Sequence, residues 1–309
     1  DRNEPKRAGR TREGMGMTGR VADTSLAQNA ILSLQASLSR VADLQNEASS
    51  GKKLTKPSDS PVDIGTSLQL HAALNRNTQL ATNISDAAAW LGTTGSAIGQ
   101  VVTQLQQVNS LVIQAANTGA TDQTSRDAIA NQIDEIRHSL IGLANTQYGN
   151  RPLFGGTTAG SAAYDASGNY VGTTAAVERT IAPGVQVQVN VTGEAVFGTP
   201  GNDIFTTLTQ LSNAIHGGQP LTALSAQLNT QTQQVETVQA TVGATASRVD
   251  TQKNQNTTNA TTMQQNLSNV EDADMAQVLM NLQTQEATYQ AALAAAAKAI
   301  QPSLAAFLQ

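Results

Sequence analysis

The sequence predicts a mainly α-helical protein, with long coiled-coil and rod segments formed by both chain ends and a small β-rich insertion in the middle. Apolar residues follow a heptad rhythm near both ends, whereas the centre is rich in Gly, Ser and Thr with alternating valines. Aromatic residues make up only 3% of the 309-residue chain. Scarce aromatic side chains suit thin helical packing better than a thick globular core.

Residues 17–60 are expected to form the N-terminal half of a coiled coil. Apolar side chains recur there in steps of four and three residues, at Ile31, Leu34, Leu38 and Val41. These steps place side chains along one side of a helix. Because a lone helix of this length is marginal in water, we expect these residues to lie in an assembly interface.

The first residues and the overall composition restrict the possible functions. Residues 1–16 are rich in Arg and Lys without apolar periodicity, so they are expected to be a disordered tail or an extension. The net charge of −5 argues against nucleic acid as a partner. No 18-residue apolar run occurs, so we expect no membrane insertion. No apolar signal core occurs either, so we expect that the chain is exported by a route without a cleaved signal peptide.

The stretch "SSGKKLTKPSDSP" follows the first heptads and has two interpretations. A phosphate-binding loop would need a second glycine and a hydroxyl directly after the lysine, and both are missing. A corner between two helices fits better: Gly51 suits the position that ends a helix, and Pro57 prevents smooth continuation. Ser60, Pro61 and Asp63 then suit the N-cap, first and third positions of the next helix.

The middle of the chain is expected to hold a helical rod domain with an insertion. Residues 61–150 and 201–265 carry apolar stripes at helical spacing and are assigned to the two halves of the rod. Residues 151–200 are expected to form a β-rich outer domain. Valines alternate with polar residues from Val185 to Val191, which is the period of a half-buried strand.

Residues 266–309 are expected to form the C-terminal half of the coiled coil. Glu271, Asp272 and Asp274 come just before the heptads, where carboxylates favour a helix N-terminus more than they suggest a metal site. The apolar residues expected in the interface are Met275, Leu279, Leu282, Tyr289, Leu293 and Ile300.

Catalytic chemistry is poorly supported by the sequence. His71, His138 and His216 lie far apart, none with a second histidine four residues away, so a zinc site is not expected. Neither a nucleophile elbow nor a dinucleotide fingerprint occurs. We expect no enzyme activity, no catalytic residue, no metal and no cofactor.

Several segments together resemble the bacterial flagellin superfamily. They are "LQNEASSGKKLTKPSDSPVDIGTSLQL" and "NVEDADMAQVLMNLQTQEATYQAALAAAAKAI" at the two ends, with "GNRPLFGGT" and "VQVQVNVTGEAVFG" around the insertion. "KPSDSP" resembles hook-associated members of the superfamily more than filament subunits. The resemblance covers residues 17–309, and the preceding tail departs from it.

The resemblance implies a structural role outside the cell, in the bacterial flagellum. The chain would form a junction layer between the hook and the flagellin filament, with the first hook-associated protein and flagellin as partners. It would self-associate in a ring-like layer, use an export chaperone and leave the cell through the flagellar type III channel. Three alternatives remain open: flagellin itself, an enzyme hidden in the insertion, and a secreted coiled-coil translocator.

Overall fold

A computed structural model of the chain describes residues 14–117, 122–158, 160 and 162–307. The helices are α1 (Gly14–Ser50), α2 (Pro61–Asn117), α3 (Gln123–Ala144), α4 (Gly193–Phe197), α5 (Ile204–His216), α6 (Thr222–Glu271) and α7 (Met275–Phe307). The strands are β1 (Gln147–Tyr148), β2 (Arg151–Pro152), β3 (Glu178–Ala182) and β4 (Val185–Gln188). The expected fold class, mainly helical with a small β-containing insertion, is confirmed.

The chain divides into two compact units. The terminal unit comprises Asp1–Ala72 and Met263–Gln309, and the central unit comprises Ala73–Thr262. The long helices α2 and α6 contribute residues to both units. The divisions therefore fall inside these two helices, whereas the sequence suggested divisions after residues 60 and 265.

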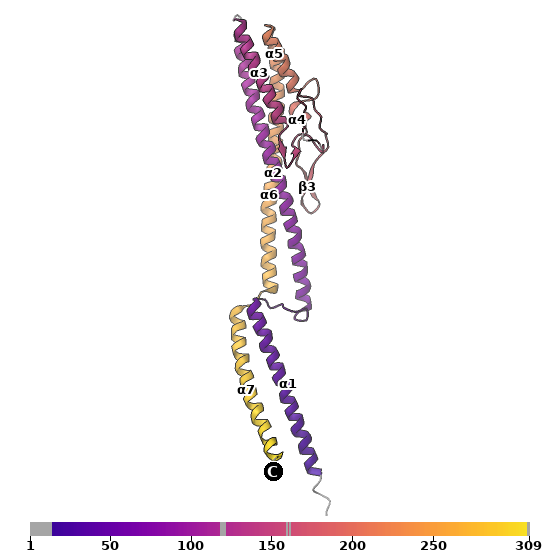
Figure 1. Cartoon of the computed structure of the whole chain (residues 1–309), viewed down its shortest axis with the longest axis vertical. Coiled ribbons are helices and arrows are strands. Elements are labelled where there is room, and N and C mark those ends of the chain that lie inside the picture. The colour runs from indigo at the N-terminus through magenta and orange to yellow at the C-terminus, as the bar shows by residue number, and fades with distance from the viewer. Residues whose placement is uncertain (1–13, 118–121, 159, 161, 308–309) are drawn as a thin grey trace, which may run out of the picture. The chain divides into compact units, whose positions relative to one another are not determined.

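In the terminal unit, α1 and α7 pack side by side in antiparallel directions (Figure 1). Gln285 Nε2 donates to Ser37 Oγ at 2.8 Å, and Ala273 N donates to Gly51 O at 2.9 Å. Many of the side chains that face each other in this pair are small or polar. The buried and half-buried positions are Ala30, Leu34, Ser37, Val41, Leu44, Glu47 and Ala48 of α1, and Val278, Leu282, Gln285, Tyr289, Ala292 and Ala296 of α7.

In the central unit, α2 and α6 lie side by side, and α3 and α5 pack beside them (Figure 1). Helix α6 buries one side chain every seven residues, as in a coiled coil: Leu228, Val235, Val242, Val249 and Asn256. At the last of these positions the seam is polar. Asn77 Nδ2 donates to the backbone oxygen of Asn256 at 3.1 Å, and Asn256 Nδ2 donates to that of Asn77 at 3.2 Å.

The insertion is held by aromatic packing more than by strands. Strands β3 and β4 pair antiparallel, with Glu178 opposite Gln188. Val187 and Val189 are buried and Gln188 between them is exposed, whereas Val185 is exposed and Asn190 is buried. The alternation expected from Val185 to Val191 is therefore present only in part, and the regular strand ends at Gln188. The rings that pack together in the insertion and the start of α5 are Phe154, Tyr164, Tyr170, Phe197 and Phe205.

Candidate assembly surface and helix joint

Helix α1 ends at a glycine that adopts a left-handed backbone conformation. Gly51 has φ 69°, and its N–H donates to Glu47 O at 2.9 Å. A Cβ at this position would meet no atom within 4 Å. Glycine is therefore favoured by the backbone angle and not by lack of space.

Helix α2 begins with the residues that the sequence assigned to its start. Pro61 is the first residue of the helix, and Ser60 Oγ accepts from Asp63 N at 3.3 Å. Pro57 lies in the preceding turn. The Asp59 carboxylate accepts from the backbone N–H of Lys56 at 2.7 Å and from that of Thr55 at 3.0 Å, and these bonds lower the pKa of Asp59.

The carboxylates before α7 have three different roles. Asp274 Oδ1 accepts from the backbone N–H of Ala276 at 3.0 Å, so this residue caps α7 as expected. Asp272 accepts a hydrogen bond from Ser268 Oγ. The capping interpretation is wrong for Glu271, because it is the last residue of α6 and its side chain is directed to other elements.

The Glu271 carboxylate forms a buried polar cluster with Lys52, Ser67 and His71, which we call the Glu271 clamp. Lys52 Nζ and Ser67 Oγ donate to it, and His71 Nε2 lies 2.7 Å from Oε1. The Glu271 side chain is 8% exposed, whereas Lys52 and His71 are about half exposed. The hydrogen bond from Lys52, aided by Ser67 and His71, lowers the pKa of Glu271 to about 2.

Further hydrogen bonds join the linker between α1 and α2 to the end of α6. Lys53 N donates to Glu271 O at 2.8 Å, and Lys53 Nζ donates to Asn269 O at 2.9 Å. With the bond between Ala273 and Gly51, they hold the α1–α2 linker against the end of α6. Lysine charge next to the last carbonyl groups of α6 is favourable to its helix dipole.

The structure separates the residues expected in one assembly interface into two groups. Those that face the partner helix within the chain are Leu34, Val41, Leu282 and Tyr289. Those that remain exposed are Ile31 (48%), Leu38 (51%), Met275 (39%), Leu279 (49%) and Leu293 (44%). The side chain of Ile300 lies outside the described residues. We call the five exposed residues the apolar stripe.

The apolar stripe lies on one surface of the α1–α7 pair. At about 100° per residue, Ile31 and Leu38 lie on one side of the α1 residues that face α7. Met275, Leu279 and Leu293 lie on the corresponding side of α7, and in an antiparallel pair these two sides form one surface. The opposite surface is polar and contains a groove of 410 Å³ lined by Arg40, Asp43, Leu44, Glu47, Asn281, Thr284 and Gln285.

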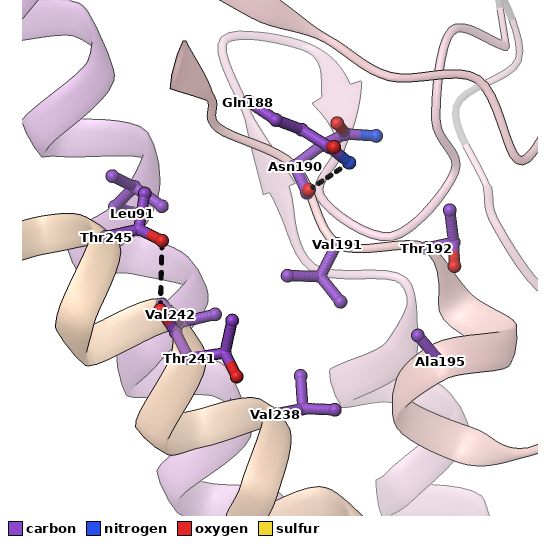
Figure 2. Close-up of a pocket in the computed structure, with 10 residues that line it drawn as sticks. All are labelled: Leu91, Gln188, Asn190, Val191, Thr192, Ala195, Val238, Thr241, Val242 and Thr245. Atoms are coloured by element: carbon purple, nitrogen blue, oxygen red, sulfur yellow. Dashed lines mark hydrogen bonds between the residues drawn. The ribbon is translucent and has the colours of Figure 1, made fainter.

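A groove in the central unit lacks the groups needed for acid–base chemistry. Figure 2 shows it between α6 and the segment that follows β4, with a volume of 320 Å³. Leu91, Val191, Val238 and Val242 contribute apolar surface. The other lining residues are Gln188, Asn190, Thr192, Ala195, Thr241 and Thr245, so none is titratable.

The three histidines lie apart, on separate elements. His71 belongs to the Glu271 clamp, His138 is exposed on α3, and His216 Nδ1 lies 2.7 Å from Asp127 Oδ1. This contact lowers the pKa of Asp127. Within the described residues, no group of three or more potential metal ligands is present. None of the described helices is both long and apolar enough to cross a membrane.

Two models of known protein families match the N-terminal and C-terminal parts of the chain. Residues 21–159 match the bacterial flagellin N-terminal helical region, and residues 222–308 match the bacterial flagellin C-terminal helical region. The two matches contain α1 from residue 21 onward, the whole of α7 and the whole Glu271 clamp. The chain belongs to the bacterial flagellin family.

Curated relatives include hook-associated proteins and flagellins. The chain is 30% identical over 171 residues to flagellar hook-associated protein 3 of Escherichia coli K12, covering 55% of this chain and 50% of that protein. It is 31% identical over 174 residues to the Salmonella typhimurium protein of the same name, covering 56% and 51%. A Clostridium tyrobutyricum flagellin is 22% identical over 136 residues, covering 44% and 36%. The chain thus matches about half the length of these hook-associated relatives.

Solved structures share the fold. FlgL of Bacillus cereus superposes with a TM-score of 0.59 at 24% identity, covering 65% of this chain and 99% of that one. A putative flagellar hook-associated protein from Vibrio parahaemolyticus has a TM-score of 0.64 at 19% identity, covering 69% and 100%. The flagellar junction protein FlgL of Legionella pneumophila has a TM-score of 0.55 at 14% identity, covering 66% and 99%.

Proposed function

We propose that this chain is a structural subunit of the bacterial flagellum that forms a junction layer between the hook and the flagellin filament. The greater identity to hook-associated protein 3 than to the flagellin supports the junction role. The partners would be further copies of the chain in a ring-like layer, the first hook-associated protein and flagellin. An export chaperone and export through the flagellar type III channel belong to the same proposal, and no catalysis is part of it.

The observation that carries the proposal is the apolar stripe on the α1–α7 pair. Among the described side chains, large exposed hydrophobic residues occur mainly in the terminal unit. Exposed apolar surface gathered on one side of a helix pair favours docking to another protein surface. We infer that the terminal unit is the assembling part of the chain and that the central unit is the rod with its outer insertion.

Seeded assembly separates the junction role from the flagellin role. Purified protein would be added to isolated hooks that carry the first hook-associated protein, and the products would be examined by electron microscopy. A junction subunit should add a thin layer and stop, and added flagellin should then extend it. Long filaments built from this chain alone would contradict the junction role and favour the filament subunit.

A charge placed in the apolar stripe tests the surface itself. Leu38→Asp should abolish layer formation, because an unpaired charge buried in an interface costs several kcal/mol. Ser39→Asp is the matched control, since Ser39 is exposed and lies outside the apolar stripe, about 100° around α1 from Leu38. It should assemble like the unaltered chain. Normal assembly of the Leu38→Asp protein would overturn the proposed interface.

A further inference from the structure

The Glu271 clamp is a buried charged cluster that the proposed docking surface does not use. It consists of one carboxylate and three donors from the α1–α2 linker and α2, whereas the apolar stripe is exposed on α1 and α7. We propose that Glu271 is a positioning residue that makes α1 and α7 pair within one chain. The proposal concerns the single chain and rests on the proposed function only for its consequence in assembly.

About half of the buried and half-buried positions between α1 and α7 are small or polar, so the pair buries less apolar area than a seam of large apolar residues would. Ser37 and Gln285 meet in the middle of the α1–α7 seam, and Ala30, Ala292 and Ala296 occupy further positions. Small side chains bury little apolar area, and hydrophobic stabilisation scales with that area. Free helices of this kind are marginal in water.

The clamp supplies what the seam lacks by bringing distant parts of the chain together. Lys52 and Glu271 are 219 residues apart in sequence. When Ala273 is hydrogen-bonded to Gly51, the end of α1 lies beside the start of α7. The two helices then separate only if the side-chain contacts between them break. Pairing then becomes a local event with a high effective concentration of one helix near the other.

Glu271 is the residue on which the clamp depends. Its carboxylate accepts from three side chains on two segments, while each donor makes a single contact to it. A buried carboxylate with several charge-assisted hydrogen bonds is held more firmly than a neutral group. Glu271→Gln keeps the shape but removes the charge and one acceptor oxygen, so at least one donor loses its partner.

The absence of cysteine allows a direct measurement of pairing. Ser37→Cys combined with Gln285→Cys places one thiol on each helix, at two positions whose native side chains are in hydrogen-bond contact. Because cysteine is shorter than glutamine, the disulfide forms only when the two helices approach closely. The equilibrium between thiols and disulfide in a glutathione buffer gives the effective concentration of one cysteine near the other, measured on monomeric protein. Glu271→Gln should lower this value about tenfold.

Two controls make the result specific. Glu286→Gln is the matched substitution, because Glu286 is exposed on α7, and it should change the effective concentration less than about twofold. Trp90, the single tryptophan, is buried in the central unit and reports its unfolding in urea. Glu271→Gln should leave that transition unchanged.

Two results would overturn the proposal. One is an unchanged effective concentration in the Glu271→Gln protein, which would show that α1 and α7 pair without the clamp. The other is an equal decrease for Glu271→Gln and Glu286→Gln, which would show a general effect of removing negative charge. Both results are independent of layer formation, so failure of the proposed junction role would be seen separately, in the seeded assembly.

Discussion

The terminal and central units differ in how much hydrophobic surface they bury. Nearly every fully buried hydrophobic side chain among the described residues belongs to one cluster in the central unit; the others are Val41, Val278 and Ala296. The terminal unit instead leaves Ile31, Leu38 and other large apolar side chains exposed. A chain that must add to a growing structure needs one part that folds alone and another whose apolar surface remains available.

The largest effect should come from opening the aromatic core of the central unit. Phe197 is fully buried, and its ring centre lies 5.3 Å from those of Tyr164 and Phe205. Phe197→Ala should cost about 3–5 kcal/mol of unfolding free energy, measured in urea by Trp90 fluorescence. Leu38→Ala, at a half-exposed position of the terminal unit, should cost less than about 0.5 kcal/mol by circular dichroism. Similar losses at both sites would remove the contrast between the units.

Acid should weaken the terminal unit through Glu271. Its pKa is lowered from 4.5 to about 2 in the folded chain. The stabilisation is therefore complete above pH 4.5 and is lost as the pH falls toward 2. The effect should be smaller than that of the core truncation, because Lys52 and His71 are half exposed and water screens part of the interaction.

Thermal unfolding of the terminal unit, followed by circular dichroism, measures this acid effect. Between pH 6 and pH 2.5 the midpoint should decrease in the unaltered protein and should change less in the Glu271→Gln protein. Equal decreases in the two proteins would assign the acid sensitivity to other carboxylates.

The buried Asn77–Asn256 pair tests polar packing in the central unit. Asn256→Ala removes the donor to the backbone oxygen of Asn77, while Asn77 Nδ2 keeps the backbone oxygen of residue 256 as its acceptor, so the change should cost about 0.5–1.5 kcal/mol. Replacing both residues by alanine should cost about the sum of the two single alanine substitutions, because each amide donates to a backbone oxygen that the other substitution leaves in place. Urea unfolding followed by Trp90 fluorescence gives all the values. A cost of the double substitution well below that sum would contradict two independent hydrogen bonds.

The smallest effect should appear at the glycine that ends α1. Gly51→Ala forces a Cβ into a left-handed conformation and should cost about 1 kcal/mol of terminal-unit stability. Gly65→Ala, inside α2 with open space around the new Cβ, should instead stabilise by about 0.5–1 kcal/mol. Effects of the same sign on the terminal unit's thermal transition would contradict this account.

Heptad spacing located both terminal helices but could not determine which side of each helix faces its partner. In α1, two heptad stripes share Leu34, Val41 and Ala48. The first stripe also contains Ile31 and Leu38, and the second also contains Ser37 and Leu44. The first stripe is the more apolar, whereas the second is the one that the structure buries. A pattern rule follows hydrophobicity, so it selects the more apolar stripe even where that stripe is left exposed.

Local chemistry was sufficient for the ends of helices, and it failed where a side chain meets residues far along the chain. Gly51, Ser60 and Pro61 act through backbone angles and neighbouring N–H groups, which the nearby sequence determines. Glu271 is surrounded by donors 200 or more residues away, so its acidic neighbours suggested only a helix cap. The sequence by itself determined the long helices, the corner between α1 and α2, and the family. Only the tertiary structure decided which apolar residues stay exposed and which carboxylate is buried, because both depend on what packs against them.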